Sequence, residues 1–311
     1  MPRGRAKITI VGAGTVGTAA AHWIASRQLG DVVLVDIVEG LPQGKALDLQ
    51  QAGPIAGFDV RVMGTNDYGD TEGSDVVIVT AGVPRKPGMT REELVGTNAG
   101  IVRSVMEQVV PRSPGAVFIV VTNPLDAMTY LAHRVSGLPR ERLFGLSGAL
   151  DSTRFRTFLA LELGVSLQDV QAMVIGAHTD KDMVPLASSA NVRGVPVSRL
   201  LPPDRLQAVV ARTRRAGAEI TELMKASAFT APGAALCAMT EAVLLDLKRV
   251  IPCCVYLDGE YGERDVCVGV PVVLGSRGVE RILEVPLSEE EERAFRASVA
   301  AVRELLAALP L

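Results

Sequence analysis

A glycine-rich turn near the N-terminus is the feature that most constrains how this 311-residue chain can fold. An apolar run at residues 7–11 leads into the turn, and helix-periodic residues follow it. The turn reads Gly-x-Gly-x-x-Gly, formed by Gly12, Ala13, Gly14, Thr15, Val16 and Gly17. A second apolar run, at residues 32–35, ends at Asp36. A strand, glycine turn, helix, strand and acid in this order are typical of a site for an adenine dinucleotide.

Each residue of this pattern has a physical task. Gly12 permits the tight turn, Gly14 lets the backbone approach a pyrophosphate at the helix N-terminus, and Gly17 lets the helix pack on the strand. Asp36 is suited to accept hydrogen bonds from ribose hydroxyls and to repel a 2′-phosphate. A glycine turn alone often has packing reasons, but the complete pattern favours a nucleotide site. We therefore predict NAD, and not NADP, as the cofactor.

Short apolar runs alternate with helix-periodic segments through the first half of the chain. Strands are expected at residues 7–11, 32–36, 60–63, 76–80, 117–121 and 143–146, and helices at 16–26, 43–51, 92–110 and 124–135. Continuous apolar strands are typical of a parallel sheet with helices on both faces. We expect an α/β fold with a doubly wound parallel sheet (Rossmann), in which ligands bind at the carboxyl edge of the strands.

The pattern changes after about residue 145. Helices are expected at residues 152–163, 203–226 and 234–248, strands at 170–175, 250–257 and 265–274, and a hairpin turn at 258–262. These elements predict an NAD-binding domain at residues 1–145 and an α+β catalytic domain at 146–311. We expect the two to pack as one unit, because no flexible linker separates them.

Composition excludes several classes of function. A net charge of −3 without a basic block argues against nucleic acid as a partner, and no apolar run is long enough for a membrane span. The start leads directly into the first strand without a secretory segment, which favours a cytoplasmic protein. The cysteines lack metal-type spacing and are expected to be buried reduced thiols, so no metal site is predicted; they are Cys237, Cys253, Cys254 and Cys267.

A second group of residues could carry chemistry. His22 and His133 lie within expected helices, whereas His178 follows an apolar strand and can act as a general base. Asp151 would orient its imidazole, and Arg154 could bind a substrate carboxylate through two parallel hydrogen bonds. Taken singly, a histidine at a strand end is more often structural, and the Asp–Arg pair is more often a surface ion pair.

The segment at residues 82–91 contains two glycines, two prolines and three cations, among them Arg85 and Arg91. It could be a solvated surface turn. Its place after a strand of the nucleotide-binding sheet also suits a lid that closes over bound substrate.

The chain resembles the lactate/malate dehydrogenase family, and within it the malate dehydrogenases of the lactate-dehydrogenase-like group, over essentially its whole length. The resemblance is carried by long motifs in the order of the family, namely Gly-Ala-Gly-Thr-Val-Gly at 12–17, Pro-Gln-Gly-Lys-Ala-Leu-Asp at 42–48, Val-Pro-Arg-Lys-Pro-Gly-Met-Thr-Arg at 83–91, Val-Thr-Asn-Pro-Leu-Asp at 121–126, Asp-Ser-Thr-Arg-Phe-Arg at 151–156, Gly-Ala-His at 176–178 and Tyr-Leu-Asp-Gly-Glu-Tyr-Gly at 256–262.

The resemblance implies roles for the catalytic residues. His178 is expected to be the general base toward malate and Asp151 its partner. Arg154 is expected to bind the C1 carboxylate, while Arg91 on the lid polarises the C2 oxygen. Arg85 is expected to pair with the distal carboxylate of oxaloacetate. Lactate dehydrogenases have glutamine at this last position, and the methyl group of pyruvate would leave an arginine unpaired in a closed site.

The resemblance also implies the remaining contacts. Asn123 is expected to hydrogen-bond the C2 oxygen, and Asn98 with the backbone of Val121, Thr122 and Asn123 is expected to hold the nicotinamide ribose. The family further implies a homo-oligomer, dimer or tetramer, that serves the tricarboxylic acid cycle.

Two departures from the family pattern concern the wall of the substrate pocket. The segment from His178 to Pro185 has one residue more than usual before the proline, and residues 225–232 are one residue shorter. Two other functions would use a similar set of residues. A lactate or broader 2-hydroxy-acid dehydrogenase is disfavoured by Arg85, and a nucleotide-sensing protein without catalysis should lack a base or an anchor.

Overall fold

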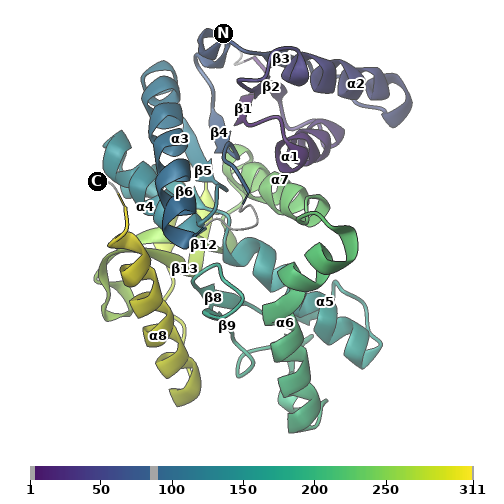
Figure 1. Cartoon of the computed structure of the whole chain (residues 1–311). Coiled ribbons are helices and arrows are strands. Elements are labelled where there is room, and N and C mark those ends of the chain that lie inside the picture. The colour runs from purple at the N-terminus through teal and green to yellow at the C-terminus, as the bar shows by residue number, and fades with distance from the viewer. Residues whose placement is uncertain (1–3, 85–89, 310–311) are drawn as a thin grey trace.

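The computed structural model describes residues 4–84 and 90–309 (Figure 1). Its first half is a parallel sheet in the strand order β3-β2-β1-β4-β5-β6. The strands are β1 (Lys7–Val11), β2 (Asp31–Val35), β3 (Val62–Thr65), β4 (Val76–Val79), β5 (Val117–Val120) and β6 (Leu143–Gly145). The helices between them are α1 (Thr15–Ser26), α2 (Leu41–Ala56), α3 (Arg91–Arg112) and α4 (Leu125–Ser136).

Both faces of this sheet are buried, as the apolar strands predict. In β4, Ile78 belongs to the apolar cluster that includes α1, α2 and α7 (Thr230–Leu244), whereas Val77 and Val79 belong to the cluster that includes α3 and α4. Alternate side chains therefore enter opposite cores. The predicted doubly wound parallel sheet is confirmed.

The second half extends the same sheet. Strand β6 pairs with β12 (Arg249–Asp258), and the order continues β12-β13-β8-β9 with antiparallel pairing. The remaining strands of this half are β13 (Arg264–Gly275), β8 (Val174–Gly176), β9 (Met183–Pro185), β14 (Gly278–Ile282) and the small sheet β7 (Val170–Gln171), β10 (Asn191–Val192) and β11 (Val195–Pro196). Its helices are α5 (Gly148–Leu163), α6 (Pro203–Met224), α7 and α8 (Glu289–Leu306).

Several expected elements have other bounds in the structure. The helix expected at 43–51 runs from Leu41 to Ala56, and the strand expected at 60–63 lies at Val62–Thr65. The helix predicted from residue 152 begins at Gly148, after Ser147 turns the chain with a φ of 31°. The helix predicted to reach residue 248 ends at Leu244, because Asp246 and Lys248 both adopt a φ of 53°. The strand predicted at 170–175 is divided into β7 and β8, which belong to different sheets.

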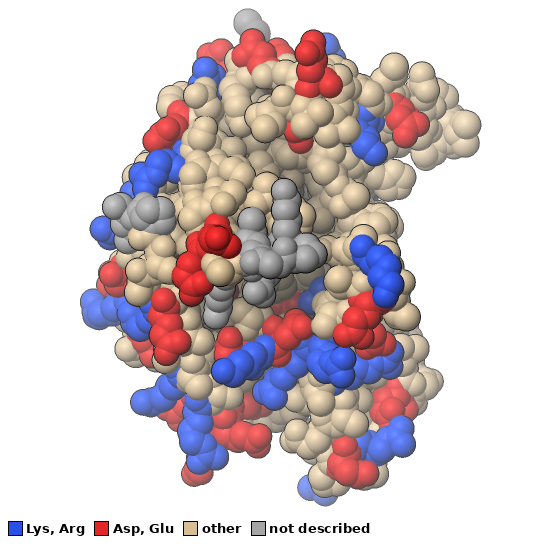
Figure 2. Space-filling view, in the orientation of Figure 1, with Lys and Arg blue, Asp and Glu red and all other residues tan. Residues whose placement is uncertain are grey.

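Figure 2 shows charged side chains of both signs crowding the lower part of one face, over the C-terminal half. The four cysteines are free and buried, as predicted. Within the described parts of the chain, no helix is both long and apolar enough to cross a membrane.

Candidate active site

The glycine turn is packed so closely that two of its positions exclude a side chain. Gly12 has a φ of 108°, and a Cβ there would lie 2.5 Å from Thr80 Oγ1. A Cβ on Gly17 would collide with the carbonyl oxygen of Gly12. Gly14, in contrast, has open space on its Cβ side and caps α1 without a side-chain hydrogen bond. The turn thus leaves room and free N–H groups for a phosphate at the start of the helix.

Asp36 lies at the rim of this turn, half-buried at the end of β2. Its Oδ2 accepts a hydrogen bond from the Ala13 amide at 2.7 Å, and its Oδ1 accepts one from the Val38 amide at 3.0 Å. Asn66 donates to the carbonyl oxygens of Asp36 and Val38 at 2.7 and 3.1 Å. Because the carboxylate is fixed and retains free lone pairs, it fits the ribose of an adenine dinucleotide.

Asn98 joins two loops at the carboxyl edge of the sheet. Its side chain donates to the carbonyl oxygens of Val83 and Asn123, at 3.1 and 2.6 Å, and accepts from the Val83 amide at 2.9 Å. The Asn98 side chain is buried, so water does not compete for these hydrogen bonds. Thr122 Oγ1 donates to the carbonyl oxygen of Ala81 at 2.7 Å, which ties the same two loops together. The peptide bond between Asn123 and Pro124 is cis.

The structure brings His178, Asp151 and Arg154 together. Asp151 and Arg154 lie one turn apart on α5, because the helix begins at Gly148. Asp151 is 1% exposed. Its Oδ2 lies 2.6 Å from His178 Nδ1, and its Oδ1 accepts a hydrogen bond from Arg154 Nη1 at 2.9 Å. His178 follows β8, and its side chain is partly open to solvent. A carboxylate can only accept, so neutral His178 carries its proton on Nδ1 and leaves Nε2 free.

Opposing effects act on this imidazole. Burial alone would lower the pKa of His178, but the charge and hydrogen bond of Asp151 outweigh burial and raise the pKa above its ordinary value of 6.5. Arg154 acts in the opposite sense to Asp151. The imidazole is therefore suited to take up and return a proton near neutral pH.

Two acids near His178 were not identified from the sequence as site residues. Burial raises the pKa of Asp180, whose carboxylate feels the charges of Arg154 and His178. Asp126, on α4, accepts the His178 main-chain amide at 2.9 Å through Oδ2 and is buried. Asp126 ends the Val-Thr-Asn-Pro-Leu-Asp motif. The position of this motif after a strand was the one sequence signal that could have pointed to Asp126 as a site residue.

The expected lid residues are placed only in part. Arg85 lies outside the described residues, as do its neighbours through 89. Arg91 is the first residue of α3, and only its main chain is described. The start of that helix is fixed by a capping box, in which Thr90 Oγ1 accepts from the Glu93 amide at 3.1 Å and Glu93 accepts from the Thr90 amide at 2.8 Å.

A turn shaped for a pyrophosphate and an imidazole paired with a buried carboxylate are the combination expected of a nicotinamide-dependent dehydrogenase. Family models identify the group to which the chain belongs. The model for the lactate/malate dehydrogenase NAD binding domain matches residues 6–145, and that for the lactate/malate dehydrogenase alpha/beta C-terminal domain matches residues 148–309. The chain therefore belongs to the lactate/malate dehydrogenase family, and its cofactor is NAD.

Individual relatives are similar over nearly the whole chain. A malate dehydrogenase of Desulforudis audaxviator is 57% identical and covers 99% of both chains. The solved structure of malate dehydrogenase from Salinibacter ruber is 49% identical, covers 97% of both chains and has a TM-score of 0.93. A lactate dehydrogenase structure from Cryptosporidium parvum, complexed with lactic acid and the cofactor, is 43% identical over 98% of both chains with a TM-score of 0.95. Overall shape thus does not separate the two substrates.

Proposed function

We propose that this protein is an NAD-dependent malate dehydrogenase, which reversibly oxidises (S)-malate to oxaloacetate. The observation that carries the proposal is the group of His178, Asp151 and Arg154 in a chain of this family. Relatives that are 50–57% identical over nearly their full length carry the name malate dehydrogenase.

The proposed roles follow from the geometry of the group. Bound NAD supplies the acceptor for the hydride that leaves C2 of malate. His178 Nε2 accepts the proton of the C2 hydroxyl, and Asp151 stabilises the resulting imidazolium through Nδ1. Arg154 uses guanidinium N–H groups not bonded to Asp151 to bind the C1 carboxylate. In the reverse reaction, His178 returns the proton to the oxygen of oxaloacetate.

The remaining substrate contacts are proposed from the resemblance. Arg91 polarises the C2 oxygen and Asn123 hydrogen-bonds the same atom. Arg85 pairs with the distal carboxylate and makes oxaloacetate a better substrate than pyruvate. Closure of the segment that carries the two arginines would exclude water and strengthen both contacts.

The cofactor contacts divide into direct and supporting ones. Residues 12–17 hold the pyrophosphate, Asp36 binds the adenosine ribose, and the backbone of 121–123 meets the nicotinamide ribose. Both side-chain N–H groups of Asn98 are donated to the Val83 and Asn123 carbonyl oxygens, and its Oδ1 accepts from the Val83 amide. Asn98 therefore acts on the cofactor by holding these loops in place.

The decisive test is the oxidation of NADH by the purified protein with oxaloacetate or with pyruvate, followed by absorbance. Rapid oxidation with oxaloacetate and slow oxidation with pyruvate is the expected result. Comparable rates with both would indicate a broader 2-hydroxy-acid dehydrogenase. NADH binding without oxidation by either acid would identify a nucleotide-sensing protein.

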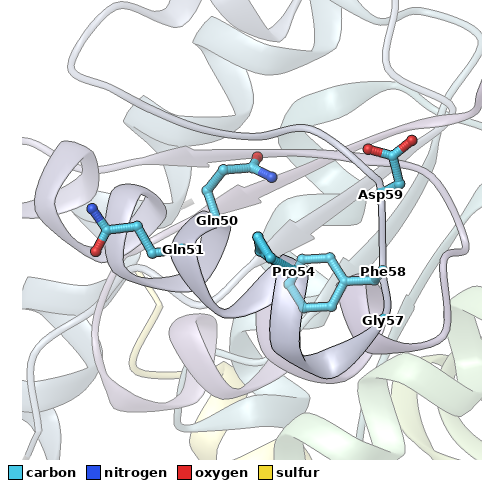
Figure 3. Close-up of a pocket in the computed structure, with 7 residues that line it drawn as sticks. Gln50, Gln51, Pro54, Gly57, Phe58 and Asp59 are labelled. Carbon is cyan, nitrogen blue, oxygen red and sulfur yellow. The ribbon is translucent and has the colours of Figure 1, made fainter.

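We also propose that the chain acts as a cytoplasmic homo-oligomer with its domain boundary near residue 145. On α2, Leu47 and Ile55 are 60% and 93% exposed. A shallow hollow at the end of this helix is lined in part by Gln51, Pro54 and Phe58 (Figure 3). An exposed apolar helix face of this kind suits contact with a second copy. Sedimentation of the wild type and of Ile55→Glu measures whether that face holds the assembly together.

A further inference from the structure

Two consecutive main-chain amides at the end of β8 are held by side chains from helices. The Ala177 amide donates to Ser298 Oγ of α8 at 2.8 Å. The next amide, that of His178, donates to Asp126 Oδ2 of α4 at 2.9 Å. The position of the imidazole therefore depends on two helices as well as on the strand that precedes it.

The two side chains that accept these amides differ in charge. Ser298 shows that a neutral oxygen suffices to accept a main-chain amide here. The neighbouring His178 amide is instead accepted by the carboxyl group of Asp126, which is 2% exposed. Its second oxygen, Oδ1, has no geometric hydrogen bond among the described residues, and only the weakly donating thiol of Cys254 interacts with the carboxyl besides the amide. Burying a carboxylate that is so poorly paired is costly, so holding an amide does not by itself explain an acid at Asp126.

We propose that Asp126 is a positioning residue of the catalytic histidine, which fixes the main chain of His178 and sets the basicity of its imidazole. The proposal rests on the proposed role of His178 as proton carrier. The hydrogen bond to the amide carries the first task, and the buried charge beside the imidazole carries the second.

The charges around His178 come from three directions. Asp151 and Arg154 face it from α5, Asp126 from α4, and Asp180 from the loop that follows β8. The negative charge of Asp126 acts to raise the pKa of His178, in the same sense as Asp151. The hydrogen bond of Asp126 is made with the main-chain amide of His178 and does not use Nε2 of the imidazole.

The surroundings of Asp126 make its own charge depend on pH. Burial raises the pKa of this carboxyl to about 6, although the hydrogen bond from the His178 amide opposes the change. The Cys254 thiol of β12 interacts with the carboxyl and also opposes the rise of its pKa. The same thiol interacts with the Cys267 thiol of β13. The charged forms of Asp126 and His178 favour each other, so the titration of one affects the titration of the other.

The test replaces the charge but keeps the acceptor. In Asp126→Asn, the side-chain oxygen can still accept the His178 amide, while the negative charge is gone. We expect the acid limb of kcat/KM for malate oxidation to move to lower pH by roughly half a unit to one unit, because the imidazole then loses its proton more easily. The base limb of oxaloacetate reduction should move in the same direction.

Ser298→Ala is the matched control. It removes the clamp on the neighbouring amide but changes no charge, so kcat should fall while both pH limbs remain where they are in the wild type. A purely structural role for Asp126 predicts that Asp126→Asn, which keeps an acceptor for the His178 amide, leaves both pH limbs where they are in the wild type. Asp126→Ser removes the charge within a smaller side chain and supplies a second variant should the asparagine prevent folding.

A readout without cofactor or turnover separates the pKa of His178 from later steps. Diethyl pyrocarbonate acylates neutral imidazole. The His178→Asn variant retains only His22 and His133, so its reaction is the background to subtract. The pH midpoint of His178 acylation in the free protein should be lower in Asp126→Asn than in the wild type and unchanged in Ser298→Ala. Equal midpoints in Asp126→Asn and wild type, in a wild type that oxidises malate, would overturn the inference. A wild type that does not oxidise malate would instead overturn the proposed function.

Discussion

Asp36 and Asp126 both accept main-chain amides of the site, but one serves the nucleotide end and the other the catalytic end. Asp36 is half-exposed and bonded to the Ala13 and Val38 amides of its own neighbourhood. Asp126 is buried, with one oxygen bonded to the His178 amide and the other unpaired among described atoms. Solvent moderates the first charge, whereas the second acts at close range in an apolar surrounding.

The two ends also differ in how the chain assembles them. The nucleotide end is built mostly from the short stretch between β1 and β3, and its groups are main-chain amides and carbonyls with a single charged side chain, Asp36. The catalytic end joins α4, α5, the end of β8 and α8. Most of its groups are charged side chains, and Asp151 and Arg154 shift the pKa of His178 in opposite directions. Single substitutions should therefore have larger effects at the catalytic end.

The largest effect is expected for His178→Asn. The variant should lose about a hundredfold to ten-thousandfold in kcat, because asparagine cannot exchange the proton with the substrate as the imidazole does. NADH affinity, measured by fluorescence, should be nearly unchanged. Near-normal turnover in this variant would rule out His178 as the proton carrier.

The pH dependence of the wild type follows from the same group used in two directions. Malate oxidation needs neutral His178 and should fall as the pH drops through its raised pKa. Oxaloacetate reduction needs the imidazolium and should fall as the pH rises through that pKa. In Asp151→Asn the pKa should decrease, because the carboxylate that stabilises the cation is removed. Initial rates across pH in both directions provide the measurement, and profiles that bend the same way would contradict the assignment.

Arg85→Gln should change substrate preference, by less than His178→Asn changes kcat. The ratio of kcat/KM for oxaloacetate to that for pyruvate should fall by roughly tenfold or more, because a charge-assisted bond in a dry site is lost. A matched Arg85→Lys variant keeps the charge but not the planar fork and should lie between the two. An unchanged ratio would show that this position does not read the distal carboxylate.

The sequence predicted the nucleotide end more completely than the catalytic end for a physical reason. Strand, glycine turn and acid are local, so their spacing in sequence already determines their spacing in space. The pairing of His178 with Asp151 was expected, but the start of α5 at Gly148 was not, because it depends on the main-chain turn at Ser147. Asp126 was included only as the last residue of a motif, because nothing in the sequence shows that its carboxyl bonds a main-chain amide 52 residues away.

Asp36→Ser, at the nucleotide end, should have a smaller effect than Arg85→Gln. NAD affinity should decrease by about threefold to tenfold as ribose hydrogen bonds are lost, and NADP should bind better because the repulsion of its 2′-phosphate is relieved. Fluorescence titration with both reduced cofactors measures the ratio. A ratio equal to that of the wild type would mean that Asp36 does not reach the ribose.

The smallest effect is expected for Asn66→Ala, which leaves Asp36 in place but removes the two hydrogen bonds that hold the carbonyl oxygens of Asp36 and Val38. Asn66 is exposed, so each bond contributes modestly, and NADH affinity should fall by roughly twofold to fivefold. The NADH-to-NADPH ratio should fall less than in Asp36→Ser, because the carboxylate remains. Gln43→Ala is the control: it removes only the 2.6 Å bond to Asn66 Oδ1 and should weaken NADH binding less than Asn66→Ala. Wild-type affinity in Asn66→Ala would show that the Ala13 and Val38 amides suffice to fix Asp36, and that the nucleotide end tolerates change even better than the comparison with Asp126 suggests.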